Sequence, residues 1–288
     1  MPYKIDQVLP DPDALPYRGD FGARRPSALN RLPLPPRPMP SRHGSRPLKA
    51  WRYIGVFGPQ LMLCLGQVRV GPARQAFWAV WDRDRRRLYE RTMLGRGRLR
   101  LTRGEARLSD DDVQLTLELD ETAGIETVCP AGGSYAWTRK QGGIRATGTL
   151  QIAGERSAID AHAVIDDTAA YYPRHTSWRW AAGVGLSADG RALAWNLVSG
   201  VNDPPVGSER TVWVDGQPHE VSPCRFAEDL TTVDGLHFDA EAERARRDNL
   251  ILVRSSYREP FGSFGGELPG AIALAEGYGV MEQHEAWW

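Results

Sequence analysis

The chain has 288 residues, 41% hydrophobic and 25% charged, which is typical of a soluble globular protein long enough for two domains. Its 36 basic and 36 acidic side chains balance, so the sequence predicts neither nucleic-acid binding nor attraction to an anionic membrane. The three cysteines are far apart, no secretory signal is visible and no run of 18 apolar residues occurs. We therefore expect a cytoplasmic protein without a membrane span.

The first 50 residues are rich in proline. Eleven of the 21 prolines lie here, most densely between Leu32 and Pro38. Proline favours extended backbone and cannot enter the interior of a sheet, so residues 1–50 are predicted to form an extended arm. We favour an arm that wraps its own domain, with Leu32, Leu34 and Met39 as anchors. The alternative is an arm that binds a partner.

Residues 51–168 contain short alternating apolar runs separated by Gly, Pro and Asp turns. This pattern is typical of antiparallel strands in a barrel or sandwich. Strands are expected over 51–57, 61–70, 75–81, 88–89, 99–101, 113–119, 135–139, 143–152 and 157–165. The segments 135–139 and 143–152 are expected to pair as a hairpin across Gln141 and Gly142. Residues 51–168 are therefore predicted to form a first β domain.

Residues 171–288 repeat this pattern and are predicted to form a second β domain. Strands are expected over 178–186, 192–198, 211–214, 218–221, 236–238, 250–257, 261–268 and 271–284. The dipeptides Asp189-Gly190 and Asp215-Gly216 are strong signals for hairpin turns. Residues 240–249 are expected to be briefly helical. The fold class is thus all-β, with two tandem antiparallel β-barrel domains after the arm.

The hairpin from Tyr171 to Gly200 concentrates side chains suited to a binding site. Its candidate residues are Tyr172, Arg174, His175, Trp178, Trp180 and Asn196. Because side chains alternate along a strand, the two tryptophans share one face, and we predict that they line a cavity at the junction of the domains. Arg174 and His175 are expected at its rim, where a neutral His175 could act as a base or simply bond to backbone. Asp166, just upstream, could pair with Arg174.

The last predicted strand places ionisable groups among large apolar residues. Glu276, Tyr278, Glu282 and His284 share a face with Ile272, Leu274 and Val280, opposite a row dominated by Ala and Gly. If no β-bulge interrupts the register, these groups point into the same interior as Trp178. Buried carboxyl and imidazole groups have shifted pKa values and suit acid–base chemistry. The alternative is a solvated position at the barrel mouth.

The sequence contains none of the strong catalytic or cofactor motifs. Walker loops, nucleophile elbows, His-Glu-x-x-His and Cys-x-x-Cys are all missing, so no cofactor is expected. His162, His175 and His284 have no ligand spacing, so no metal site is predicted.

Six sequence blocks in one order resemble the bacterial DUF2804 family of proteins. The blocks are Trp51–Cys64, Gln75–Asp82, Arg174–Trp180, Ala194–Val198, Asn249–Ser255 and Gly277–His284, within a match over about residues 45–288. The resemblance implies a tandem lipocalin-like (calycin) fold, similar in outline to AttH-like proteins and carotenoid hydratases. Those hydratases protonate an isoprenoid double bond from an acid in an aromatic-lined tunnel. No motif here matches their acid, so the analogy concerns the fold alone.

The functional hypothesis is a protein that holds a hydrophobic small molecule, of terpenoid or polyketide type, in a Trp-lined pocket. Cofactor-independent hydration, isomerisation or cyclisation is the chemistry that would fit. Glu282 or Glu276 would be the acid and His175 or His284 its partner, while Trp178 and Trp180 would stabilise a developing cation. Further ligand contacts are expected from Arg174, Tyr172, Asn196, Tyr278 and Asp166. The rival hypotheses are a non-catalytic lipid or metabolite carrier and a structural interaction protein that uses the arm.

Overall fold

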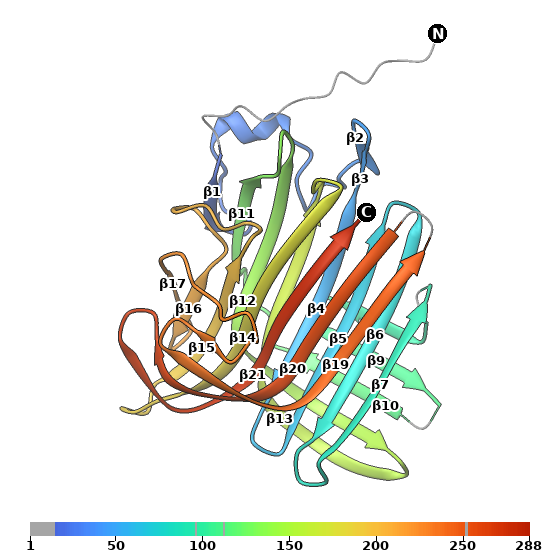
Figure 1. Ribbon diagram of the computed structural model, residues 1–288, viewed down its shortest axis with the longest axis vertical. Helices are drawn as coiled ribbons and strands as arrows, with labels where there is room; N and C mark the ends of the chain where they lie inside the picture. Colours follow the sequence, from blue (N-terminus) through green and yellow to red (C-terminus); the bar gives the residue numbers. More distant parts are fainter. Residues whose placement is uncertain (1–14, 96, 112, 251–252) are drawn as a thin grey trace.

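The computed structural model describes residues 15–95, 97–111, 113–250 and 253–288, which are almost entirely antiparallel strands (Figure 1). Strand makes up 67% of the structure and helix 2%, which confirms the all-β fold class. Within the described ranges the one helix is the short 3-10 helix η2 (Ser27–Arg31). No helix formed by the described residues is both long and apolar enough to cross a membrane.

The first sheet has eleven strands and curls around its own core. Its strands are β1 (Tyr17–Asp20), β4 (Lys49–Phe57), β5 (Leu61–Val70), β6 (Ala73–Asp82), β7 (Arg87–Leu94), β8 (Leu99–Thr102), β9 (Glu105–Asp110), β10 (Val113–Leu119), β11 (Ile125–Pro130), β12 (Tyr135–Ile152) and β13 (Glu155–Ala170). The order is β7-β6-β5-β4-β13-β12-β10-β9-β8, and β11 pairs with β1 and β12. The curl brings Leu63 and Trp78 into one buried cluster with Leu108 and Leu115.

The second sheet has eight strands in the order β17-β16-β15-β14-β21-β20-β19-β18. They are β14 (His175–Ser187), β15 (Ala192–Ser199), β16 (Thr211–Val214), β17 (Gln217–Glu220), β18 (Thr232–Val233), β19 (Leu236–Leu250), β20 (Val253–Leu268) and β21 (Ile272–Trp287). In Figure 1 the red and orange strands β19–β21 lie in front of the blue and cyan strands β4–β7. A separate two-stranded ribbon joins β2 (Arg42–His43) to β3 (Arg46–Pro47).

The two sheets pack face to face over a shared apolar layer. Tyr53 and Phe77 of the first sheet and Trp180, Phe261 and Val280 of the second belong to one buried cluster. The opposite face of the second sheet covers another core, formed around Trp195, Phe238 and Phe264. The expected boundary near residue 170 coincides with the change of sheet, between β13 and β14. Two tandem domains remain a prediction, because the sheets bury this layer together.

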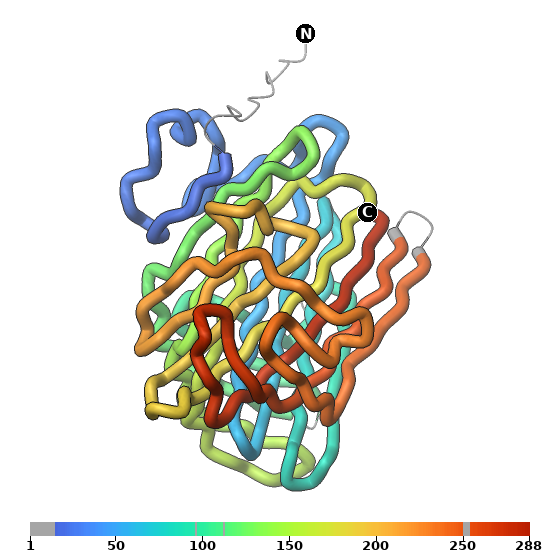
Figure 2. The backbone as a smooth tube through the Cα atoms, turned by 60° about the vertical axis from the view of Figure 1, so that its left-hand side comes forward, coloured from blue at the N-terminus to red at the C-terminus, as the bar shows by residue number. Residues whose placement is uncertain are grey.

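The described part of the N-terminal segment packs along the first sheet (Figure 2). Leu32, Leu34 and Met39 are buried in one cluster with Val128 and Trp137. β1 also pairs with the edge of β11, where it satisfies backbone groups that an edge strand leaves unpaired. The part of the expected arm formed by residues 1–14 lies outside the described residues.

The predicted helix over 240–249 is wrong, because these residues belong to the 15-residue strand β19. β19 pairs with β20 from Leu236↔Gly266 to Leu250↔Val253, with one bulge between Ala240 and Ala242. The local charge pattern would suit a helix in isolation. Cross-strand hydrogen bonding overrides such weak local preferences.

Two other boundaries also differ from the prediction. The segments 135–139 and 143–152 form the single strand β12 and not a hairpin, and a bulge between Gly142 and Ile144 absorbs the glycines. Gly143 takes a φ of +71°, which glycine adopts without steric cost. The segments 250–257 and 261–268 were predicted as two strands, but the structure has one strand, β20, from Val253 to Leu268. Strands β9 and β11 were not predicted.

Candidate functional site

A cavity of about 270 Å³ lies between the two sheets. Most of its wall surface is apolar, and half of its lining residues are aromatic or aliphatic, among them Trp51, Tyr53, Val68, Val70, Phe77, Trp178, Trp180, Val198, Val201, Tyr257 and Trp288. It extends to the surface at Leu94, which lines it and is 81% exposed. Apolar cavities with a few converging polar groups are the usual form of small-molecule sites, and this volume lies near the lower end of their range.

Strand register places the polar groups of the second sheet in rows across the cavity wall. In the first row, Trp178 of β14 is opposite His284 of β21, and His284 is opposite Tyr257 of β20. In the next row, Trp180 is opposite Glu282. Residues two apart on a strand share a face, so Glu282 and His284 project to the same side as the two tryptophans.

The Glu282 carboxyl group is buried in this wall, with 8% of the residue exposed. Trp178 Nε1 donates a hydrogen bond of 2.7 Å to Glu282 Oε1. Burial raises the pKa of Glu282 well above its ordinary value, and the negative charge of Glu259 raises it further. Burial therefore favours the protonated, neutral form of Glu282.

The His284 imidazole lies beside this acid and is also kept neutral. Burial, with a smaller contribution from the Arg244 charge, lowers the pKa of His284 to about 3. Its Nε2 forms a 2.8 Å hydrogen bond with Ser255 Oγ, and its Nδ1 is 3.8 Å from Glu282 Oε1. Because the ring is neutral, the contact with Glu282 is not an ion pair. His284 can instead orient a ligand or a water molecule.

A second buried carboxyl group, Glu259, lies on the neighbouring strand. It is fully buried and is opposite Arg244 of β19. Burial raises the pKa of Glu259, while the Arg244 guanidinium opposes that rise. When two carboxyl groups interact, their environments decide which one keeps a proton. The cation opposite Glu259 favours its ionised form, and Glu282 has no such partner, so the proton is favoured on Glu282.

A polar cluster from both sheets forms another part of the wall. Lys140 Nζ is 2.6 Å from Asp166 Oδ1 and 3.2 Å from Glu209 Oε1. Trp51 Nε1 donates to Asp166 Oδ2 at 3.0 Å. Asn202 Nδ2 donates to Glu209 Oε2 at 3.0 Å. The two carboxylates outweigh the burial penalty on Lys140 and raise its pKa, so the ammonium stays charged.

The structure brings five of the predicted site residues to the cavity: Asp166, Trp178, Trp180, Glu282 and His284. Asp166 pairs with Lys140, and not with Arg174 as the sequence suggested. Two further predicted residues are buried close to the cavity without lining it. Asn196 Oδ1 accepts a 2.8 Å hydrogen bond from Trp180 Nε1, and Tyr172 Oη accepts one of 2.7 Å from Asn202 Nδ2. They support the wall.

Arg174 and His175 do not form the rim of the cavity. Both are exposed. His175 Nε2 contacts Glu285 Oε1 at 2.9 Å, and its ring stacks on Trp287 at 4.4 Å. β14 begins at His175, and side chains alternate along a strand. His175 is three residues before Trp178, so its side chain points to the opposite face of the strand, away from the cavity.

Glu276 and Tyr278 are also separated from the cavity. Glu276 is exposed and accepts a 3.2 Å hydrogen bond from the Tyr278 hydroxyl. Leu186 is opposite Glu276 but Ser187 is opposite Leu274, so β21 has a bulge at Ala275. This bulge reverses the earlier positions, and Leu274 packs against the core on the other face from Val280. The predicted unbroken parity is therefore wrong for Ile272 and Leu274 and holds from Glu276 to His284. Glu276 keeps the face of Tyr278 but is exposed, outside the buried layer.

Several residues of the site were not found from the sequence: Tyr53, Lys140, Asn202, Glu209, Arg244, Tyr257 and Glu259. A signal existed for two of them, because alternation within each strand places Arg244 on the face of Ala242 and Glu259 on the face of Phe261, which pack in the layer between the sheets. The helical interpretation of 240–249 hid it. For Asn202 and Glu209, which lie between strands, no periodic signal exists.

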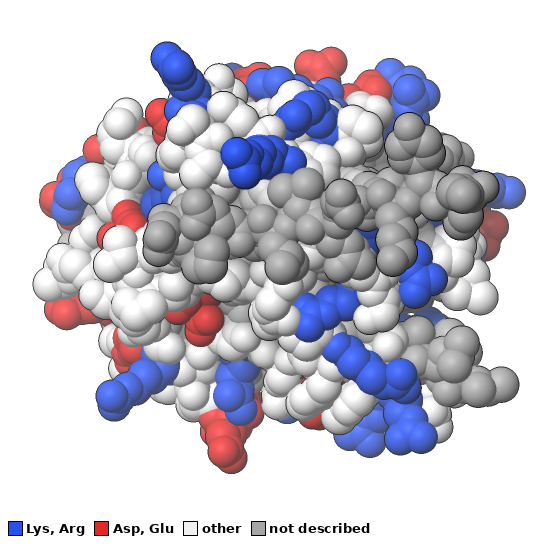
Figure 3. Space-filling model, turned by 90° about the horizontal axis from the view of Figure 1, so that it is seen from above, with Lys and Arg blue, Asp and Glu red and all other residues white. Residues whose placement is uncertain are grey.

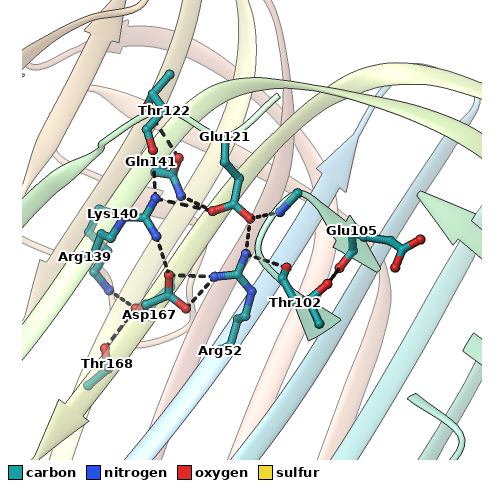
Figure 4. A network of polar contacts seen from close by, with 12 residues as sticks. Arg52, Thr102, Glu105, Glu121, Thr122, Arg139, Lys140, Gln141, Asp167 and Thr168 are labelled. Atoms are coloured by element: carbon teal, nitrogen blue, oxygen red, sulfur yellow. Dashed lines mark hydrogen bonds and ion pairs between the residues drawn. The ribbon is translucent and has the colours of Figure 1, made fainter. Parts of the chain in front are cut away.

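A second polar network supports the cavity wall from the far side of β4 and β13 (Figure 4). Arg52 Nη1 donates to both Asp167 oxygens at 2.8 Å, and Arg52 also pairs with Glu121. Arg139 contacts Asp167 and Glu121, each at 3.4 Å. Trp51 and Asp166 face the cavity while their neighbours Arg52 and Asp167 face the interior of the first sheet. The network therefore holds the cavity-facing pair in register.

The fold and the site define a protein of curled antiparallel sheets with an aromatic-walled cavity between them. Its sequence belongs to the family described as Domain of unknown function (DUF2804), whose model matches residues 95–288. Comparison with curated proteins finds no match.

Two solved structures share this fold. A putative AttH protein from Nitrosomonas europaea is 13% identical, with a TM-score of 0.51, over 88% of this chain and 98% of that one. Kievitone hydratase from Nectria haematococca is 10% identical, with a TM-score of 0.50, over 82% of this chain and 88% of that one. Both likenesses are consistent with the lipocalin-like fold that the sequence blocks implied. At these identities they establish the fold and no activity.

Proposed function

We propose that this protein binds a hydrophobic small molecule between its sheets and transfers a proton to it from Glu282. The observation behind the proposal is the neutral Glu282 carboxyl group, buried among aromatic rings and held by Trp178 Nε1. A carboxylic acid kept protonated at neutral pH is suited to general acid catalysis. Leu94, exposed where the cavity reaches the surface, offers an apolar point of entry.

The reaction class that follows is cofactor-independent hydration, isomerisation or cyclisation of an unsaturated molecule of terpenoid or polyketide type. The Glu282 proton forms a C–H bond with one carbon of a double bond and leaves a cation on the other, while Glu282 becomes a carboxylate. The faces of Trp178 and Trp180 stabilise that cation.

The cation then has three outcomes. Water adds to it and returns a proton to Glu282 in hydration, and a neighbouring carbon loses a proton to Glu282 in isomerisation. In cyclisation a second double bond attacks it to form a C–C bond, and the new cation then loses a proton from a neighbouring carbon to the Glu282 carboxylate. The likeness to kievitone hydratase supports hydration as a chemistry that this fold accommodates.

The test begins with the ligand that co-purifies with the full chain. Organic extraction and mass spectrometry would identify it, and incubation with wild-type protein in D₂O would follow. Proton transfer to carbon leaves a non-exchangeable C–D bond, so we expect the product to be one mass unit heavier than the same product formed in H₂O. Glu282→Gln keeps the side-chain shape and an oxygen for Trp178 Nε1, so it should bind the ligand and leave its mass unchanged.

The control is Glu276→Gln, which removes an exposed carboxyl group from the same strand and should retain deuterium incorporation. Binding without incorporation by the wild type would overturn the catalytic part and favour the carrier. Recovery of no small molecule, together with failure to bind any apolar probe, would contradict the binding function itself.

A further inference from the structure

We infer that a second cavity, behind the wall formed by β4, β5 and β6, binds a small organic anion through the guanidinium groups of Arg69 and Arg74. This cavity has a volume of about 240 Å³, and both arginines line it. It is a site additional to the one around Glu282, which does not line it.

Strand geometry places both arginines on the inner face of the first sheet. Arg69 shares a face of β5 with Leu65, which is buried in the core that this sheet curls around. Arg74 of β6 is directly opposite Arg69, and opposite residues of paired strands project to the same side. On this face Gln67 Nε2 donates a 2.7 Å hydrogen bond to Leu99 O of β8. The two guanidinium groups therefore project into the space that β8 helps to enclose.

The two positive charges have no counter-charge in this cavity. Like charges directly opposite each other on paired strands repel and destabilise the sheet. Among the described residues, no carboxylate lines the cavity. Of the Arg69 nitrogens only Nε is buried without a partner, so the Nη groups are those that an anion can reach. Arg74 is exposed and is therefore accessible as well.

The neighbouring polar network does not neutralise this pair. Arg52 lines the same cavity, but it is held by Asp167 and Glu121 (Figure 4). Arg139 contacts the same two carboxylates, so the network contains two cations and two anions. The charges of the opposed arginines remain in excess. An anion held between them would replace their repulsion with two attractive contacts.

The lining selects an organic acid over an inorganic ion. A guanidinium group matches the oxygens of a carboxylate, and one carboxylate can offer an oxygen to each of two arginines. The cavity is many times larger than the space that one water molecule needs. Ala50 and Leu101 give it apolar surface for the body of the ligand. The ligand class that fits is a small carboxylic acid in its ionised form.

The test compares benzoate with benzamide, its neutral analogue, by isothermal titration calorimetry on the full chain at low salt. Wild type should bind benzoate about tenfold more tightly, a preference of the size that one charge-assisted hydrogen bond provides. Arg69→Gln should bring the preference to near one. Arg69 lines this cavity and not the aromatic one, so that loss locates the site.

Arg100→Gln is the matched control. Arg100 is also directly opposite an arginine, Arg107, but both are exposed and neither lines the cavity. This variant should keep the preference for benzoate. Loss of the preference in Arg100→Gln, or its survival in Arg69→Gln, would contradict the assigned site.

Two results with wild type would overturn the inference even if the variants failed to fold. One is equal binding of the two probes, or binding of neither, and the other is tighter binding of inorganic phosphate than of benzoate. Urea unfolding without ligand then separates binding from a structural role. Removal of one of two repelling charges should leave the midpoint of Arg69→Gln unchanged or higher. A clearly lower midpoint would show that Arg69 is paired within the chain, and would also overturn the inference.

Discussion

The hydrogen bond from Trp178 to Glu282 runs diagonally between two paired strands. Trp178 is directly opposite His284, and Glu282 is opposite Trp180, yet Trp178 Nε1 reaches Glu282 Oε1 at 2.7 Å. Diagonal neighbours on one face of a sheet lie within reach of long aromatic side chains. The bond fixes the plane of the Trp178 ring, which stacks on Trp51 of the other sheet at 6.0 Å. The acid is thereby connected to both walls of the cavity.

Glu282 should make the protein less stable as the pH rises. Its pKa is raised in the folded state, so the folded protein binds more protons than the unfolded chain above the ordinary value of 4.5. The stabilisation is complete below pH 4.5 and is lost as the pH rises towards the folded-state pKa, by up to about 1.4 kcal/mol per unit. Urea unfolding across this range should show a flatter curve for Glu282→Gln, and an unchanged decline for Glu276→Gln. Parallel curves for wild type and Glu282→Gln would contradict a protonated Glu282.

His284 should have the opposite effect at acid pH. Its folded-state pKa of about 3 lies below the ordinary value of 6.5, so the unfolded chain binds the extra proton. The stability that neutral His284 contributes is complete above pH 6.5 and is lost as the pH falls towards 3. In urea unfolding, His284→Gln should reduce this loss of stability at acid pH. The control His162→Gln, at an exposed histidine, should not reduce it. An NMR titration in which the His284 ring protonates near pH 6.5 would refute the buried, neutral assignment.

Trp178 should behave as part of a cavity wall and Trp195 as part of a packed core. Trp195 is fully buried in the cluster with Phe264, so Trp195→Ala should cost about 3–5 kcal/mol of unfolding free energy. Trp178 lines the cavity, so Trp178→Ala should cost clearly less and should weaken binding of the co-purifying ligand. Equal losses of stability, measured by urea unfolding, would show that Trp178 is a core residue.

Asp167 should be far more important for stability than Asp160, although both lie on β13. Asp167 forms two hydrogen bonds with Arg52 and contacts Arg139, so Asp167→Asn would leave two largely buried cations short of a partner. We expect a loss of about 3 kcal/mol or more. Asp160 pairs with Arg145 on the surface, where solvent screens the pair, so Asp160→Asn should change stability far less. Similar losses in both variants would show that the network in Figure 4 contributes little.

Charge on the surface follows the balanced composition. On the end of the molecule drawn in Figure 3, basic side chains are scattered among acidic and uncharged ones of the described residues. The one strongly organised set of charges described above is inside the molecule, around the cavity and behind its wall. Function is therefore better sought there than on this face.

Local sequence determined the fold class and half of the acid site. Turn dipeptides and alternation are properties of neighbouring residues, so strands 61–70 and 113–119 were predicted with the bounds that the structure has. The same alternation placed Trp178 and Trp180 together on one face of their strand. It also placed Glu282 and His284 together on one face of theirs.

Only the tertiary structure decided which of these groups share a cavity. The packing of the sheets leaves Glu276 exposed while it buries Glu282, and the pairing of β19 with β20 places Arg244 opposite Glu259. Asn202 meets Lys140 and Asp166 only because the two sheets pack against each other. The physical reason is that alternation depends on one strand, whereas register depends on bulges and distant partners. The loss of water that sets the pKa of Glu282 depends on the packing of both sheets.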